Sequence, residues 1–125
     1  MKKLILILTI ILFINLTIVS AMDIKFFYSN GCPHCENIKP LVNELINYFP
    51  EHNWQIYETS IPENQKLFQE YGFQGVPSFV FIDGNNLVKF SGADQQRLIC
   101  ETQRMSTKDC VTYSANNCRS AGWFE

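Results

Sequence analysis

The tetrapeptide Cys32-Pro33-His34-Cys35 lies between a strand-like run and a helix-like run, and this placement restricts both the fold and the chemistry of the chain. Before it, Ile24–Tyr28 is a short apolar run rich in aromatic residues, and a glycine-containing turn ends it. After it, apolar residues recur at helical spacing as far as Pro50. The pattern predicts a buried strand, a turn and a helix whose first turn contains both cysteines.

Two cysteines separated by two residues can alternate between a dithiol and a disulfide. Cys32 falls at the N-terminus of the predicted helix, where the helix dipole and unpaired backbone N–H groups favour a thiolate. His34, when protonated, adds a cation beside it, and Pro33 suits a first helical turn because its missing N–H costs nothing there. The motif predicts thiol–disulfide exchange in which Cys32 attacks, Cys35 resolves, and Pro33 and His34 tune the reactivity of Cys32.

Residues 1–21 have the pattern of an export signal. Lys2 and Lys3 precede a nearly unbroken apolar stretch, which ends at Val19-Ser20-Ala21. This order is typical of a secretory signal cleaved after Ala21. The alternative is an uncleaved membrane anchor formed by residues 4–21, which is near the lower limit of about 17 residues for a membrane-spanning helix. In both cases we expect the remaining chain outside the cytoplasm, in the periplasm, at the cell surface or secreted.

The charge and the cysteine count limit the possible partners and compartments. Removal of residues 1–21 takes away two lysines and no acidic residue, so the formal charge falls from −2 to −4. No basic stripe remains, which argues against nucleic acid as a partner. The 5 cysteines fit an oxidising compartment, and their odd number prevents complete pairing within one chain.

The chain after the signal is predicted to form one domain over residues 22–105, followed by a tail over residues 106–125. Apolar periodicity and turn residues predict three further strands and two further helices. The strands are expected over 54–59, 78–82 and 87–91, and the helices over 62–71 and about 93–105. The order βαβαββα indicates an α/β fold, a four-stranded mixed sheet with helices on both faces.

This order of elements, with Cys-Pro-His-Cys after the first strand and Gly75-Val76-Pro77 before a buried strand, resembles the thioredoxin fold over roughly residues 23–105. Pro40 lies five residues after Cys35, where thioredoxins carry a helix-kinking proline. The Pro-His pair between the cysteines and the valine before Pro77 resemble the periplasmic disulfide-oxidase branch of the family. The small core, without an extra N-terminal strand and helix, is also similar to glutaredoxins.

The resemblance implies a substrate platform and a set of partners. It implies a cis Val76-Pro77 bond, and a Val76 backbone that pairs with an extended peptide beside Cys32. It implies no cofactor other than the redox-active disulfide Cys32-Cys35. The implied partners are protein thiols and disulfides of exported proteins, together with a membrane redox partner.

One position departs from the family pattern. Phe26 stands six residues before Cys32, where thioredoxins and the oxidases carry a buried acid that helps proton transfer to the second cysteine. Glu58, on the neighbouring predicted strand, is a candidate proton relay that would replace this acid. The alternative is that Glu58 is a solvated acid at the edge of the sheet.

Cys100, Cys110 and Cys118 are candidates for one structural disulfide and one spare thiol. Their spacing does not choose among the three possible pairs, because a disulfide needs Cα atoms within about 7 Å. The alternative is a second redox pair that passes electrons to Cys32 and Cys35. These cysteines lack a helix-start position and a nearby cation, so the sequence does not indicate that they are reactive.

We therefore expect an exported thiol–disulfide oxidoreductase that acts on protein thiols through Cys32 and Cys35, with oxidation or isomerisation favoured. One alternative is an extracytoplasmic thioredoxin-like reductase fed by a membrane electron donor. Another is a non-catalytic secreted module whose two cysteines form a structural staple. A metal site is not expected, because zinc normally needs four Cys or His ligands, no second CxxC occurs, and His52 falls in a predicted turn.

Overall fold

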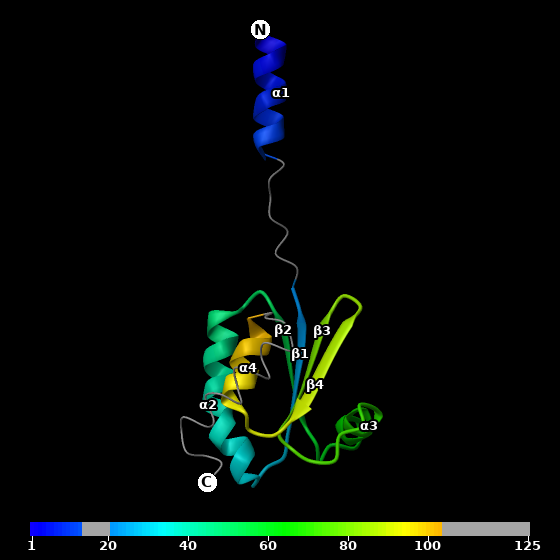
Figure 1. Ribbon diagram of the computed structural model, residues 1–125. Coiled ribbons are helices and arrows are strands. Elements are labelled where there is room, and N and C mark those ends of the chain that lie inside the picture. Colours follow the sequence, from blue (N-terminus) through cyan, green and yellow to red (C-terminus); the bar gives the residue numbers. More distant parts are fainter. Residues whose placement is uncertain (14–20, 104–125) are drawn as a thin grey trace.

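The strands pair into one mixed sheet with the order β2-β1-β3-β4, shown in a computed structural model that describes residues 1–13 and 21–103 (Figure 1). The four strands, all of six residues, are β1 (Asp23–Tyr28), β2 (Asn53–Glu58), β3 (Ser78–Asp83) and β4 (Asn86–Ser91). β1 runs parallel to β2 and antiparallel to β3, and β3 pairs antiparallel with β4. The predicted α/β fold with a four-stranded mixed sheet is therefore confirmed.

The helices cover both faces of this sheet (Figure 1). α2 (Pro33–Tyr48) and α4 (Gln95–Thr102) pack on one face, and α3 (Pro62–Glu70) packs on the other. A further helix, α1 (Lys2–Phe13), lies in the predicted signal segment. No helix within residues 1–13 and 21–103 has both the length and the apolar character of a membrane span.

Two apolar clusters hold the layers together, one on each side of the sheet. The cluster under α2 and α4 contains ten buried residues: Met22, Ile24, Phe26, Ile38, Val42, Leu45, Phe79, Phe81, Phe90 and Leu98. The cluster under α3 is centred on Phe27, whose ring lies 5.0 Å from that of Tyr57 and 5.7 Å from that of Phe68. Side chains alternate between these clusters along β1, as expected for a strand buried on both faces.

α2 follows the helical pattern seen in the sequence. Pro33 occupies its first turn, and the buried side chains of Ile38, Val42 and Leu45 recur on one face. Pro40 lies inside the helix, and α2 nevertheless continues from Pro33 to Tyr48 without interruption. The N-terminal end of α2, which carries the two cysteines, follows the end of β1 after a short turn.

The start of α4 differs from the sequence prediction. The helix begins at Gln95 rather than near Ala93, because Asp94 has extended backbone angles and its carboxylate accepts the N–H of Arg97 at 3.0 Å. This is an N-cap, which satisfies one backbone donor that has no partner within the helix. The helix ends at Thr102, with Gln103 as its C-cap, and thus stops short of the predicted end near residue 105.

His52 lies in the bend between α2 and β2, as the sequence predicts, but it is buried there, with 7% of its surface exposed. Its Nδ1 accepts the backbone N–H of Met22 at 3.3 Å, so its Nε2–H is free to donate to the carbonyl of Thr102, 3.2 Å away. The imidazole also stacks on the ring of Phe49. His52 thus joins the start of β1 to the last turn of α4.

Candidate active site

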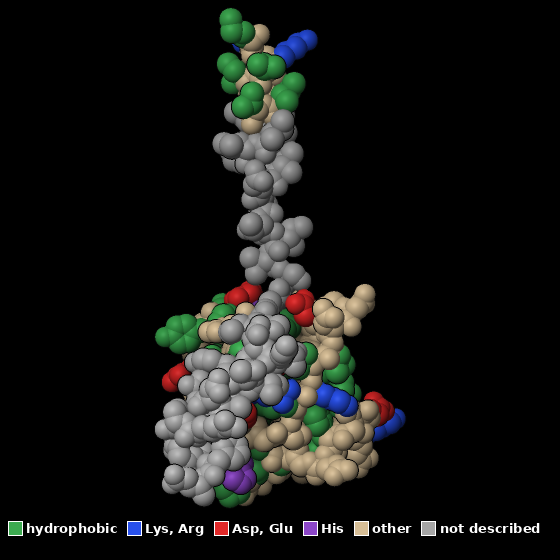
Figure 2. Space-filling model, viewed as in Figure 1, with side chains coloured by type: hydrophobic (Ala, Val, Ile, Leu, Met, Phe, Trp, Pro, Cys, Tyr) green, Lys and Arg blue, Asp and Glu red, His purple; other side chains and the backbone are tan. Residues whose placement is uncertain are grey.

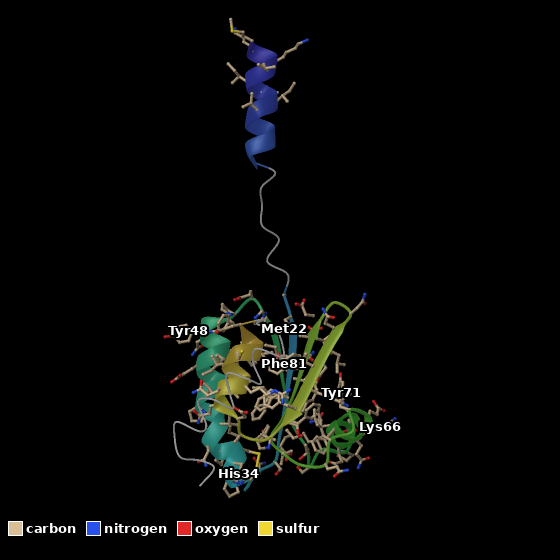
Figure 3. All side chains as sticks on the ribbon, viewed as in Figure 1. Met22, His34, Tyr48, Lys66, Tyr71 and Phe81 are labelled. Carbon is tan, nitrogen blue, oxygen red and sulfur yellow. A yellow bond between two sulfur atoms is a disulfide. The ribbon has the colours of Figure 1, made fainter. Side chains whose placement is uncertain are left out.

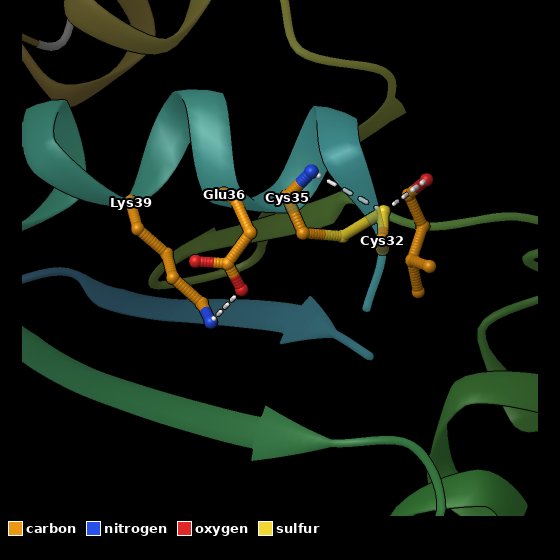
Figure 4. A network of polar contacts seen from close by, with 5 residues as sticks. Cys32, Cys35, Glu36 and Lys39 are labelled. Atoms are coloured by element: carbon orange, nitrogen blue, oxygen red, sulfur yellow. Dashed lines mark hydrogen bonds and ion pairs between the residues drawn. A yellow bond between two sulfur atoms is a disulfide. The ribbon is translucent and has the colours of Figure 1, made fainter. Parts of the chain in front are cut away.

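Cys32 and Cys35 form a disulfide at the N-terminus of α2, with Cα atoms 5.2 Å apart (Figure 4). Cys32 is the N-cap residue, and its Sγ accepts the backbone N–H of Cys35 at 3.2 Å. The same sulfur lies 3.8 Å from the carbonyl oxygen of Val76. A negative charge that develops on Cys32 is therefore met by a backbone donor and by the positive end of the helix dipole.

The two sulfurs differ in their access to solvent. Cys35 is fully buried, at 0% exposure, whereas Cys32 is partly exposed. An incoming thiolate can reach only the sulfur that faces solvent, so the disulfide is open to attack at Cys32. This geometry agrees with the predicted roles of attacking Cys32 and resolving Cys35, which remain predictions for the reaction itself.

Pro33 and His34 are exposed on the first turn of α2. Figure 3 labels His34 at the end of the domain that carries the disulfide, far from Met22, and Figure 2 shows a histidine on the surface there. A protonated imidazole at this position would lie beside the cap residue Cys32. Its role in tuning Cys32 stays a prediction.

The segment before β3 lies against the disulfide. The Val76-Pro77 peptide bond is cis, in agreement with the expectation from the family pattern. Pro77 is fully buried and its carbonyl accepts the N–H of Gly92 at 2.8 Å, whereas Val76 is only partly buried. The backbone of Val76 therefore lies in a fixed loop beside the exposed sulfur, where an extended substrate could pair with it.

No titratable side chain stands at the position of the missing acid. Phe26 is 1% exposed and stacks on Phe79 with ring centroids 5.0 Å apart, so this site is part of the apolar core. Glu58 does not compensate for it. Its carboxylate binds the hydroxyl and backbone N–H of Ser60, and these hydrogen bonds hold the pKa of Glu58 below its usual value.

A proton relay works best with a pKa that is raised toward the operating pH. The hydrogen bonds that lower the pKa of Glu58 thus favour its alternative interpretation, an acid engaged locally at the edge strand β2. The relay role of Glu58 has no support in this geometry.

Sequence reasoning missed an ion pair next to the disulfide. Lys39 Nζ lies 2.6 Å from Glu36 Oε1 (Figure 4). The ammonium also lies 4.4 Å from the centroid of the Tyr28 ring. Both residues are on the first two turns of α2, on the side that faces β1. The i,i+3 spacing of opposite charges directly after Cys35 was the signal that could have revealed this pair.

Cys100 is disulfide-bonded and 1% exposed, in the last two turns of α4. Cys110 and Cys118 lie outside the described residues, so the pairing among the three cysteines stays open. The contact of His52 with Thr102 and Met22 places this end of α4 beside the start of β1, while Cys32 follows the end of β1. Since a six-residue strand spans about 20 Å, Cys100 is too far from Cys32 for direct exchange within one chain.

Metal-binding residues do not gather in the described part of the chain. Among residues 1–13 and 21–103, no three His, Cys, Asp or Glu side chains are close enough to hold one ion. The redox group of the site is the Cys32-Cys35 disulfide itself.

Comparisons with known proteins agree with this geometry. The family model for thioredoxin matches residues 19–104. A thioredoxin of Methanocaldococcus jannaschii is 33% identical over 82 residues, which is 66% of this chain and 92% of that protein. Thioredoxin H4 of Arabidopsis thaliana is 32% identical over 73 residues, 58% of this chain and 60% of that protein. The structure of Fasciola hepatica thioredoxin matches with a TM-score of 0.61 and 27% identity, over 70% of this chain and 83% of that one.

The mixed sheet, the disulfide at the start of α2 and the cis-proline loop beside it define a thiol–disulfide oxidoreductase. The family match extends over more than half of the sequence. The chain belongs to the thioredoxin family. The expectation of a non-catalytic stapled module is thereby set aside, and the predicted oxidoreductase of this fold is confirmed.

Proposed function

We propose that this thioredoxin-family protein acts outside the cytoplasm and introduces or rearranges disulfides in other exported proteins. The observation that carries the proposal is the second disulfide at the buried Cys100, which is separate from the redox-active one. Structural disulfides persist in oxidising compartments and are rare in the cytosol. The predicted export signal in residues 1–21 supports the same location.

The exchange proceeds in two thiolate attacks. A substrate thiolate attacks Cys32 Sγ, a mixed disulfide forms, and the Cys32-Cys35 bond breaks so that Cys35 leaves as a thiolate and takes up a proton. A second substrate thiolate then attacks the substrate sulfur of the mixed disulfide and releases Cys32 as a thiolate. Two electrons pass from the substrate dithiol to the protein, which ends as a dithiol while the substrate gains a disulfide.

Three features support oxidation as the preferred direction. The helix end and the Cys35 N–H stabilise a thiolate on Cys32, and the exposed His34 can add a positive charge. Each of these favours the reduced protein, and a disulfide whose reduced form is stabilised is a stronger oxidant. A redox partner, which we expect in the membrane, would then reoxidise the dithiol.

A second function is favoured by the comparisons. The relatives named above are thioredoxins, and a thioredoxin-like reductase outside the cytoplasm would use the same residues in reverse. Reduced Cys32 would attack a substrate disulfide and Cys35 would resolve the mixed disulfide. A membrane electron donor would have to supply the electrons.

Trapping of mixed disulfides tests the proposal. A Cys35→Ala variant of the full chain should accumulate disulfides between Cys32 and exported proteins in an extracytoplasmic fraction. The matched Cys32→Ala variant, which keeps only the buried sulfur, should trap none. Adducts confined to cytoplasmic proteins would contradict the location, and the absence of adducts with both variants would contradict exchange with protein thiols.

A further inference from the structure

The bond between Ala21 and Met22, where the signal is predicted to be cut, joins an exposed residue to a buried one. Ala21 is exposed, whereas Met22 is 3% exposed and belongs to the core cluster under α2 and α4. The core thus begins with the first residue after the predicted cleavage site.

Backbone hydrogen bonds fix the same residue. The N–H of Met22, which belongs to the bond to be cut, donates to Nδ1 of the buried His52 at 3.3 Å, and the carbonyl of Met22 accepts the N–H of Asn53 at 2.9 Å. The next residue, Asp23, is paired on both sides, with Asn53 of β2 and Ile82 of β3. Both polar groups of Met22 and the strand that follows it are therefore engaged in the fold.

A peptidase needs an extended and accessible chain on both sides of the bond that it hydrolyses, and native proteins are cut mainly at exposed or locally unfolded segments. To offer Met22 and Asp23 in this form, the folded domain would have to break the contact with His52 and detach the start of a central strand. Figure 3 labels Met22 at the end of the sheet where the chain enters the domain, opposite His34.

We propose that folding closes the Ala21–Met22 bond to hydrolysis, so that the signal is removed before β1 docks or is retained as an anchor. Hydrolysis adds one water across this amide and leaves a carboxylate on Ala21 and an α-ammonium on Met22. The inference rests on the proposed export, since only an exported chain meets a signal peptidase. Whether the protein is secreted or stays anchored then depends on which occurs first, cleavage of the bond or folding of the domain.

The two products would share one active site. Cys32 follows the end of β1, whereas the signal joins its start, so a retained anchor attaches to the end of the sheet remote from the disulfide. Both forms leave Cys32 accessible, and they differ in whether substrates are met near the membrane or in solution.

The test compares four substrates of a purified type I signal peptidase in detergent micelles. They are the folded full chain, a synthetic peptide of residues 1–30, a full chain with Gly-Ser-Gly-Ser inserted between Ala21 and Met22, and the His52→Ala full chain. The folded chain should be cut roughly 100-fold more slowly than the peptide, because cleavage follows the small population of the locally open form. The insertion, which moves the bond out of the fold, should restore cleavage to nearly the rate of the peptide.

The His52→Ala variant should be cut faster than the folded wild-type chain, because the hydrogen bond between the N–H of Met22 and His52 is lost. A His34→Ala control, at the opposite end of the domain, should be cut at the rate of the folded wild-type chain. If the folded chain is cut as fast as the peptide, folding does not close the bond and the inference is overturned while the export signal stands. If the peptide and the insertion variant both resist, Ala21–Met22 is not a processing site, and the inference fails together with the cleaved-signal interpretation but not with the thiol chemistry.

Discussion

At the scale of single residues, the site depends on the contrast between two sulfurs. Cys32 is partly exposed, receives a backbone N–H and lies against Val76, whereas Cys35 is buried behind it. The order of attack in the proposed mechanism follows from this contrast. Because position 26 holds a buried phenylalanine, no acid at that position can assist proton uptake by Cys35.

His34 is the residue whose removal should change the redox equilibrium without changing the fold. We expect His34→Ala to lower the reduction potential of the Cys32-Cys35 pair by about 30 mV, which corresponds to about 1.4 kcal/mol, because the imidazole that can carry a positive charge beside the Cys32 thiolate is lost. Equilibration with glutathione measures this shift. An Asn37→Ala control, exposed on the next part of α2, should leave the potential unaltered. An equal reduction potential for the His34 variant and the wild type would show that His34 does not tune Cys32.

Glu101 should make the free energy of unfolding decrease as the pH rises. Burial raises the pKa of Glu101 above its usual value of 4.5, and the guanidinium of Arg97, 3.8 Å away, lowers it only in part. The folded protein therefore holds this proton to a higher pH than the unfolded chain does, so ionisation of Glu101 reduces stability as the pH rises above about 4.5.

Replacement of this carboxylate by an amide tests the sign. Glu101→Gln should raise the free energy of unfolding at pH 7, and the advantage over the wild type should shrink toward zero below pH 4. Urea unfolding at a series of pH values measures both. A variant that is less stable than the wild type at pH 7 would show that the ion pair with Arg97 outweighs the cost of burial.

At the scale of helices and strands, the caps decide where elements begin. Asp94 caps α4 through the N–H of Arg97. Asp94→Ala should lower the free energy of unfolding by about 1 kcal/mol, whereas Asp94→Ser, which keeps an acceptor, should retain most of it. Denaturant unfolding of the two variants distinguishes a capping role from a general loss of charge. If the loss of charge were the cause, the serine variant would be as unstable as the alanine variant.

The positions of most helices and strands could be predicted from the sequence. The strands and α2 were found because buried strands and an amphipathic helix impose different periods on apolar residues. The start of α4 was placed two residues too early, since apolar periodicity does not register a cap. The burial of His52 and Met22 and the contact of Lys39 with Tyr28 were missed because they depend on tertiary packing between distant segments.

In the active site, too, the residues of local motifs could be predicted, whereas the contacts between distant segments could not. Cys32, Cys35 and Pro77 stand in a local motif and in a family pattern, so their positions could be predicted from spacing and resemblance. For Glu58 the sequence left two interpretations open, a proton relay and a solvated acid at the sheet edge. The hydrogen bonds of its carboxylate to Ser60 favour the second, and these contacts could not be predicted from the sequence.

At the scale of the whole molecule, the sheet separates two functions. One end carries the redox disulfide and the Val76-Pro77 loop, and the other carries the predicted signal junction, His52 and the end of α4. The buried Cys100 belongs to the second end, and we propose that its disulfide stabilises the domain without taking part in exchange.

Removal of this cysteine tests that separation. Cys100→Ala should lower the free energy of unfolding by about 2–4 kcal/mol, because the disulfide no longer constrains the unfolded chain. The reduction potential of Cys32-Cys35 and the trapping of mixed disulfides should stay unaltered. A loss of substrate turnover in a variant that is still folded would instead support a second redox pair that passes electrons to Cys32.

The reduction potential of the Cys32-Cys35 pair tests the proposed direction of the reaction most directly. Equilibration of the wild-type chain with glutathione buffers, followed by thiol alkylation, gives this value. The account predicts a potential above about −200 mV, in the range of proteins that oxidise or rearrange disulfides. A potential near about −270 mV, which is typical of thioredoxin, would contradict an oxidising role and favour the reductase.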